Sequence, residues 1–240
     1  MYNILDTEYV FDRMGVLSMT ATRECSEDAR KNLPLGRSSD KLKNDAISGS
    51  QLEVCLSTFD SLRGRLSILP NEGAMLEPLA VSGLEMVDCY RKDAGNFIAS
   101  GDLVTAFAAI NYAHAWIGCF GELGLFNVRP DNELYLTIQD SDDDGCRITD
   151  EKMAKYLDIT TRARKKLRIS PPVRSFDRKL ALEFLERSES YFKTAVSYRN
   201  DDDYVRAFAA VNYAHAWLDG GARIGLFDVD GDDVLFTLYE

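Results

Sequence analysis

Two histidines and two tryptophans are the residues whose type and spacing could most readily do chemistry together. The stretch AFAAINYAHAW at Ala106–Trp116 recurs as AFAAVNYAHAW at Ala207–Trp217, and these two stretches hold all the histidine and tryptophan of the 240-residue chain. Histidine is the common general base and metal ligand near neutral pH. If the two copies met, His114 and His215 could form one catalytic or metal centre.

The helical spacing of the same stretch favours a structural histidine instead. At 100° per residue Ala106, Ile110, Ala113 and Ile117 form one stripe, which is the expected core face of a bundle helix. His114 lies on the flank of this stripe. We therefore interpret His114 and His215 as partly buried side chains that hydrogen-bond to a neighbouring helix.

The opposite face of the repeated helix is also apolar and aromatic, where a solvent face would be charged. A helix that is apolar on both faces is buried on both sides, so the strand segment, the other repeat or an outside partner must cover this face. Tyrosine and tryptophan suit interfaces because each joins a large apolar area to one polar atom. The candidate binding residues are Asn111, Tyr112, His114, Trp116, Asn212, Tyr213, His215 and Trp217.

The sequence DSDDDGCRITDE has the spacing of a calcium-binding EF-hand loop. Asp140, Asp142, Asp144 and Glu151 stand at ligand positions, with Gly145 at the turn. Against a calcium site, Arg147 replaces the expected hydrophobic residue and the preceding LYLTIQ is strand-like, whereas an EF-hand needs a helix there. We interpret the segment as an acidic interdomain loop and keep calcium as the alternative. DVDGDD, at 228–233, is interpreted as a hairpin turn.

Other enzyme and cofactor signatures are missing from the sequence. There is no G-x-S-x-G, P-loop or G-x-G-x-x-G. One histidine per repeat, with all five cysteines before the second copy, cannot supply a repeated zinc site. We expect free thiols, no catalytic residues and no cofactor.

The net charge of the chain restricts the classes of partner that it is expected to bind. The formal net charge is −11, and both nucleic acids and anionic membranes attract basic proteins. No window of eighteen consecutive apolar residues suggests a membrane span, and the N-terminus lacks a basic, apolar leader. We expect a cytoplasmic protein that binds neither nucleic acid nor membrane.

The chain is a tandem duplication with an offset of 101 residues, the separation of His114 and His215. Matches such as Pro70/Pro171, Leu84/Leu185 and Gly124/Gly225 continue without a gap, and a unit this long is a domain. We predict a polar, loosely ordered N-terminal extension at 1–44, repeat 1 at 45–139, an acidic linker at 140–148 and repeat 2 at 149–240.

Each repeat is predicted to be three helices followed by a β-hairpin or strand pair. The first helix spans Ser50–Ile68 or Thr149–Ile169, with a capping box at Ser50-Gln-Leu-Glu53 and a proline beyond its end. The second spans Leu76–Ala99 or Ser175–Tyr198. The third begins at Asp102 or Asp203 and ends before Gly124 or Gly225. The fold class is mainly α: two tandem, up-down three-helix bundles.

The repeated motif resembles an archaeal helical family, domain of unknown function 357. Asn-Tyr-Ala-His-Ala-Trp followed by Gly-Leu-Phe carries the resemblance, which covers most of each repeat. Copy one departs from it, because Gly118 stands where copy two has Asp219. The resemblance implies an albumin-binding-domain-like bundle in an archaeal cytoplasm and implies no activity.

Two functions fit these features. The first is a non-enzymatic helical adaptor that uses the Tyr/Trp face of the third helix for inter-repeat packing, for an unknown protein partner or for self-association. The alternative is a small-molecule or calcium-binding protein that uses a pocket between the repeats, or the loop from Asp140 to Glu151.

Overall fold

The computed structural model describes residues 43–138 and 145–238, and the structural statements below refer to these ranges. Repeat 1 comprises β1 (Ala46–Ile47), α2 (Gly49–Gly64), α3 (Glu77–Ser100), α4 (Leu103–Glu122) and the short 3-10 helix η3 (Leu134–Thr137). Repeat 2 comprises β2 (Cys146–Arg147), α5 (Asp150–Lys166), β3 (Arg168–Ile169), α6 (Phe176–Asn200), α7 (Tyr204–Arg223) and β4 (Phe227–Asp228). The prediction of two mainly helical repeats is confirmed.

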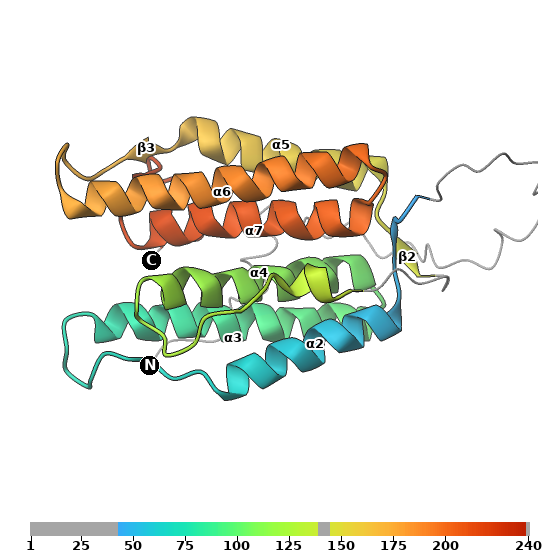
Figure 1. The fold of residues 1–240 in the computed structure, drawn as a ribbon, viewed down its shortest axis with the longest axis horizontal. Helices are drawn as coiled ribbons and strands as arrows, with labels where there is room; N and C mark the ends of the chain where they lie inside the picture. The colour runs from blue at the N-terminus through green and yellow to red at the C-terminus, as the bar shows by residue number, and fades with distance from the viewer. Residues whose placement is uncertain (1–42, 139–144, 239–240) are drawn as a thin grey trace, which may run out of the picture.

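The third helix of each repeat lies at the centre of the molecule. Figure 1 shows α4 and α7 side by side between the outer helices, and α4 and α7 contact each other while each also packs on the two other helices of its own repeat. Every residue of α4 from Val104 to Ile117 is buried. By length and composition α4 could cross a membrane, but 89% of its apolar window is buried, as in the core helix of a folded protein.

Local sequence explains where the helices begin and end. The side chains of Asp102 and Asp203 accept hydrogen bonds from the backbone N–H three residues on, as predicted for N-caps. The capping box of α2 is formed by Ser48 with Gln51, so its prediction at Ser50 was wrong. Ser48-Gly-Ser-Gln fits the same pattern as Ser50-Gln-Leu-Glu.

The first helix of each repeat ends earlier than predicted, at Gly64 and at Lys166. The residues between the helix and the proline pair instead with the segment that follows the third helix. β3 pairs antiparallel with β4, and Ile68 bridges Phe126 at the equivalent place in repeat 1. The predicted short strand pairs are confirmed, but they are not hairpins after the third helix, because each strand there pairs with a segment earlier in the same repeat.

The segments at the start of each repeat also join the two repeats. β1 pairs antiparallel with β2, and the backbone carbonyl of Asn44 accepts hydrogen bonds from Tyr204 N and Val205 N at the start of α7. Residues 44–48 and 145–148 were predicted as the end of an extension, the start of a repeat and part of a linker. In the structure they are paired segments that tie each repeat to the other.

Candidate functional site

The eight candidate binding residues all lie inside the molecule. Each is at most 4% exposed, and they lie on α4 and α7, the two helices that pack against each other at the centre. The residues are Asn111, Tyr112, His114 and Trp116 of α4 with Asn212, Tyr213, His215 and Trp217 of α7. The sequence left open whether the strand segment, the other repeat or an outside partner covers this face. In the structure, the other repeat and the segments that follow α4 and α7 lie over it.

Tyr213 of repeat 2 meets His114 of repeat 1. Its hydroxyl lies 2.6 Å from His114 Nδ1 and accepts a hydrogen bond of 2.9 Å from the backbone N–H of Leu134. A tyrosine hydroxyl has one proton, so with Leu134 as donor the proton points to the imidazole. Burial lowers the pKa of His114 to about 4, and neutral His114 accepts this hydrogen bond at Nδ1.

Tyr112 of repeat 1 meets Asp219 of repeat 2. The Tyr112 hydroxyl donates to Asp219 Oδ2 at 2.8 Å, while Asp219 Oδ1 accepts from the backbone N–H of Thr237 at 2.5 Å. Asp219 is 0% exposed. Sequence reasoning noted Asp219 only because copy one has Gly118 there, and missed its role in joining the repeats.

The residues after β4 form a strap, residues 235–238, that is fixed to one face of α7. His215 Nε2 donates to Leu235 O at 3.0 Å, Asp219 holds Thr237, and Arg223 donates to Leu238 O at 2.6 Å. His215, Asp219 and Arg223 are spaced four residues apart, which puts them on one side of a helix. Their spacing was the sequence signal that could have predicted this strap.

A second strap, residues 133–138, follows α4 and is fixed by repeat 2. Tyr191 donates to Glu133 at 2.7 Å, Tyr213 bonds Leu134, and Arg206 donates to Ile138 O at 2.9 Å. The two straps thus differ in their anchors, because residues 235–238 are held mainly by the third helix of their own repeat and residues 133–138 are held by the other repeat.

The asparagines and tryptophans of the motif do not converge on one site. The side-chain amides of Asn111 and Asn212 donate to the carbonyls of Phe107 and Phe208, one turn earlier on their own helices. The indole rings pack within their own repeats, Trp116 on Phe120 and Trp217 on Phe184. The asparagine amides thus bind their own helices, and the indole rings pack within their own repeats.

The electrostatics of this region oppose acid–base chemistry. Burial lowers the pKa of His215 as it does that of His114, and burial raises the pKa values of Tyr112 and Tyr213 well above the ordinary value. All four side chains are therefore neutral near pH 7, away from the pKa that efficient proton transfer requires.

Of the calcium candidates, Asp140, Asp142 and Asp144 lie outside the described residues. Glu151 is exposed in the first turn of α5. The backbone of Gly145 packs closely against the backbone of Ile47, since a Cβ at Gly145 would lie 2.3 Å from the carbonyl oxygen of Ile47. Within residues 43–138 and 145–238, no group of three or more histidine, cysteine or acidic side chains is placed to hold a metal ion. The four cysteines in these ranges are free thiols.

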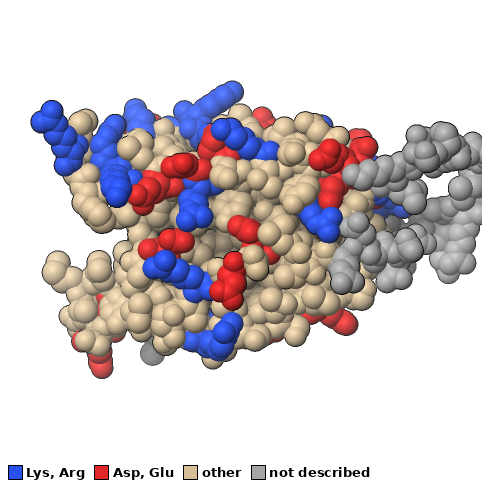
Figure 2. Space-filling model, viewed as in Figure 1, with Lys and Arg blue, Asp and Glu red and all other residues tan. Residues whose placement is uncertain are grey.

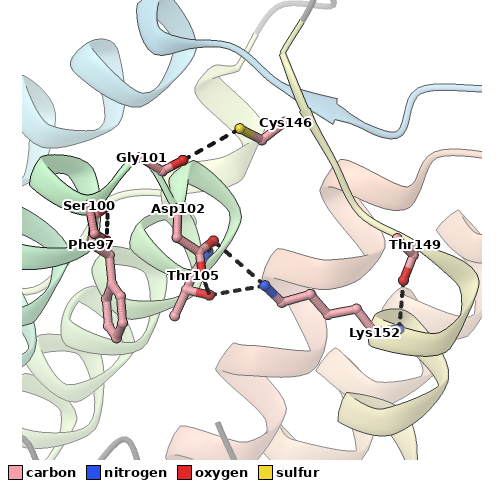
Figure 3. A network of polar contacts seen from close by, with 8 residues as sticks. All are labelled: Phe97, Ser100, Gly101, Asp102, Thr105, Cys146, Thr149 and Lys152. Atoms are coloured by element: carbon pink, nitrogen blue, oxygen red, sulfur yellow. Dashed lines mark hydrogen bonds and ion pairs between the residues drawn. The ribbon is translucent and has the colours of Figure 1, made fainter. Parts of the chain in front are cut away.

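A lysine at the start of repeat 2 makes a further contact between the repeats (Figure 3). Lys152 Nζ lies 3.0 Å from Thr105 Oγ1 and 3.7 Å from Asp102 Oδ1, at the first turn of α4. Burial is the largest influence on Lys152 and lowers its pKa. Beside it, Cys146 Sγ contacts the carbonyl of Gly101 at 3.7 Å.

Comparison with known proteins fits this duplicated architecture. The family model described as "Protein of unknown function (DUF357)" matches residues 58–126 and 155–227, which together make up more than half of the chain. The chain belongs to this family. No curated protein matches it, and no solved structure does. The two matched DUF357 regions end at Phe126 and Phe227, before either strap begins.

Proposed function

We propose that this DUF357 chain is a non-enzymatic helical adaptor. In this proposal the Tyr/Trp face of α4 and α7 serves to join the two repeats, and a protein partner binds elsewhere on the surface. The buried hydrogen bonds from Tyr213 to His114 and from Tyr112 to Asp219 support the first half of the proposal, since each joins one repeat to the other.

The partner surface that we propose is an end face made of two loops. It comprises Leu69, Met75, Leu76, Val173 and Phe176, whose side chains are 52, 97, 55, 75 and 71% exposed. The loop between α2 and α3 and the loop between β3 and α6 project from the same end of the molecule (Figure 1). Figure 2 shows an indentation between these two projections.

One observation carries the proposal: Met75 and Phe176 are highly exposed at equivalent positions of the two repeats. Single exposed apolar residues are ordinary, but apolar residues clustered on one face mark interaction sites. Phenylalanine and methionine are also among the residues enriched at protein interfaces. Because the pair Met75 and Phe176 keeps a large exposed apolar side chain at this end of both copies, we assign the end face to a protein partner.

Site-specific photo-crosslinking in cells that naturally contain the protein tests this function. A benzophenone amino acid is placed at Met75 or at Phe176, and at Val54 as the control, because Val54 is 48% exposed on α2 but outside the end face. We expect one protein, identified by mass spectrometry, to be crosslinked from positions 75 and 176 and not from 54. Equal crosslinking from all three positions, or none from the end face, would refute the proposal.

A further inference from the structure

The charges around the end face indicate which partner it fits. Glu72 and Glu77 are the only charged residues of 66–79 on the repeat-1 side, whereas Arg174, Arg178 and Lys179 outnumber Asp177 on the repeat-2 side. Figure 2 shows the same division, with blue on one projection and red on the other. One end of the molecule thus carries an acidic and a basic projection, each with an exposed apolar side chain.

Resting on the proposed function, we propose that the partner at the end face is a second copy of this chain. A twofold axis perpendicular both to the long axis of the molecule and to the line that joins the two projections brings two end faces together. It places the acidic projection of one copy against the basic projection of the other, twice. Such an interface is isologous and closes as a dimer, and the same pairing puts Met75 of one copy beside Phe176 of its partner.

The mixed charge favours a second copy over an anionic surface. A phospholipid membrane or a nucleic acid would attract Arg174 but repel Glu72 and Glu77 at the same end. Within the described residues, neither Glu72 nor Arg174 has an ion-pair partner, so both are available to an opposite charge. Complementary charges at an interface set its register and exclude the wrong pairing.

Charge reversal with a reciprocal rescue tests the dimer in the full-length chain. Sedimentation equilibrium over about a hundredfold range of concentration gives the dimer dissociation constant. We expect Glu72→Arg alone and Arg174→Glu alone each to weaken the dimer about tenfold or more, since like charges then face each other. The chain with both changes restores complementarity, and its constant should return to within about threefold of the unchanged chain.

Apolar variants complete the test. Met75→Ser and Phe176→Ser should each weaken the dimer, and Val54→Ser should leave it unchanged. Circular dichroism establishes that each variant is folded. A further test needs no variant. When unlabelled and ¹⁵N-labelled copies of the unchanged chain are mixed, carbodiimide should link Glu72 of one copy to Lys179 of another.

Three results would overturn the inference. They are a chain that is monomeric at every concentration, a dimer insensitive to the end-face changes, and Arg174-dependent binding to phosphatidylserine vesicles by a monomeric chain. If the chain is monomeric while positions 75 and 176 crosslink to a different protein, the second copy is refuted and the proposed adaptor function stands.

Discussion

The hydrogen bond between Tyr112 and Asp219 should supply measurable coupling between the two repeats. Tyr112 lies on α4 of repeat 1, Asp219 lies on α7 of repeat 2, and both are 0% exposed. The perturbation is a double-mutant cycle made of Tyr112→Phe, Asp219→Ala and the chain with both changes. Tyr112→Phe keeps the ring that packs on Tyr90 at 4.6 Å between centroids and removes only the hydroxyl.

The expected magnitude follows from the contacts that each change removes. Tyr112→Phe removes one hydrogen bond to a carboxylate, which contributes about 1.5–3 kcal/mol. Asp219→Ala leaves two donors without a partner, the buried Tyr112 hydroxyl and the half-buried Thr237 N–H, at about 1–3 kcal/mol each. We expect a loss of about 2–6 kcal/mol for Asp219→Ala and a coupling energy of about 1.5–3 kcal/mol between the two positions.

Urea unfolding, followed by tryptophan fluorescence and by circular dichroism, measures the four free energies of unfolding. Tyr213→Phe combined with Asp219→Ala is the matched control, because Tyr213 bonds His114 and Leu134 and not Asp219. The control pair should be additive to within about 0.5 kcal/mol. A coupling below about 0.5 kcal/mol for Tyr112 with Asp219 would refute the assignment of this contact as a link between the repeats.

Two further predictions concern pH and glycine. The folded-state pKa of His114 is about 4 and the ordinary value is 6.5. As the pH falls, His114 is therefore protonated in the unfolded chain before it is protonated in the folded chain. The contribution of neutral His114 is therefore present above pH 6.5 and is lost as the pH falls toward 4, about 3 kcal/mol in all. His114→Gln should make the free energy of unfolding depend less on pH between 6.5 and 4. An unchanged dependence on pH would contradict this role of His114. Gly221→Ala should destabilise by about 1–3 kcal/mol, since its Cβ would lie 2.2 Å from Phe227 Cε2. Gly118→Ala meets nothing within 4 Å and should stabilise α4 by about 0.5–1 kcal/mol; thermal unfolding that ranks the two variants alike would be the opposing result.

The helical part of the fold could be predicted from the sequence because its signals are local or repeated. The offset of 101 residues identified two equivalent units, and Asp102 and Asp203 gave the starts of α4 and α7. The β pairing could not be predicted, because strands of two residues have no periodicity to detect. Ala46–Ile47 and Arg168–Ile169 are defined by partners distant in the sequence.

The candidate site was only half determined by the sequence. Two apolar faces on one helix require two covers, and the pattern of Tyr112 and Trp116 is the same whether the cover is another repeat or another protein. The straps decide between these covers in the structure, since Leu134 and Thr237 bring backbone N–H groups to Tyr213 and Asp219. Nothing in the spacing of the straps themselves predicts these long-range contacts.

Acrylamide quenching of the intrinsic fluorescence tests most directly whether the Tyr/Trp face is internal. Trp116 and Trp217 are the only tryptophans, and they are 0% and 4% exposed. We predict that the quenching constant of the native chain is several times smaller than that of the chain in urea. A native constant as large as the denatured one would show that the face is open to solvent and would contradict the internal packing of the two repeats.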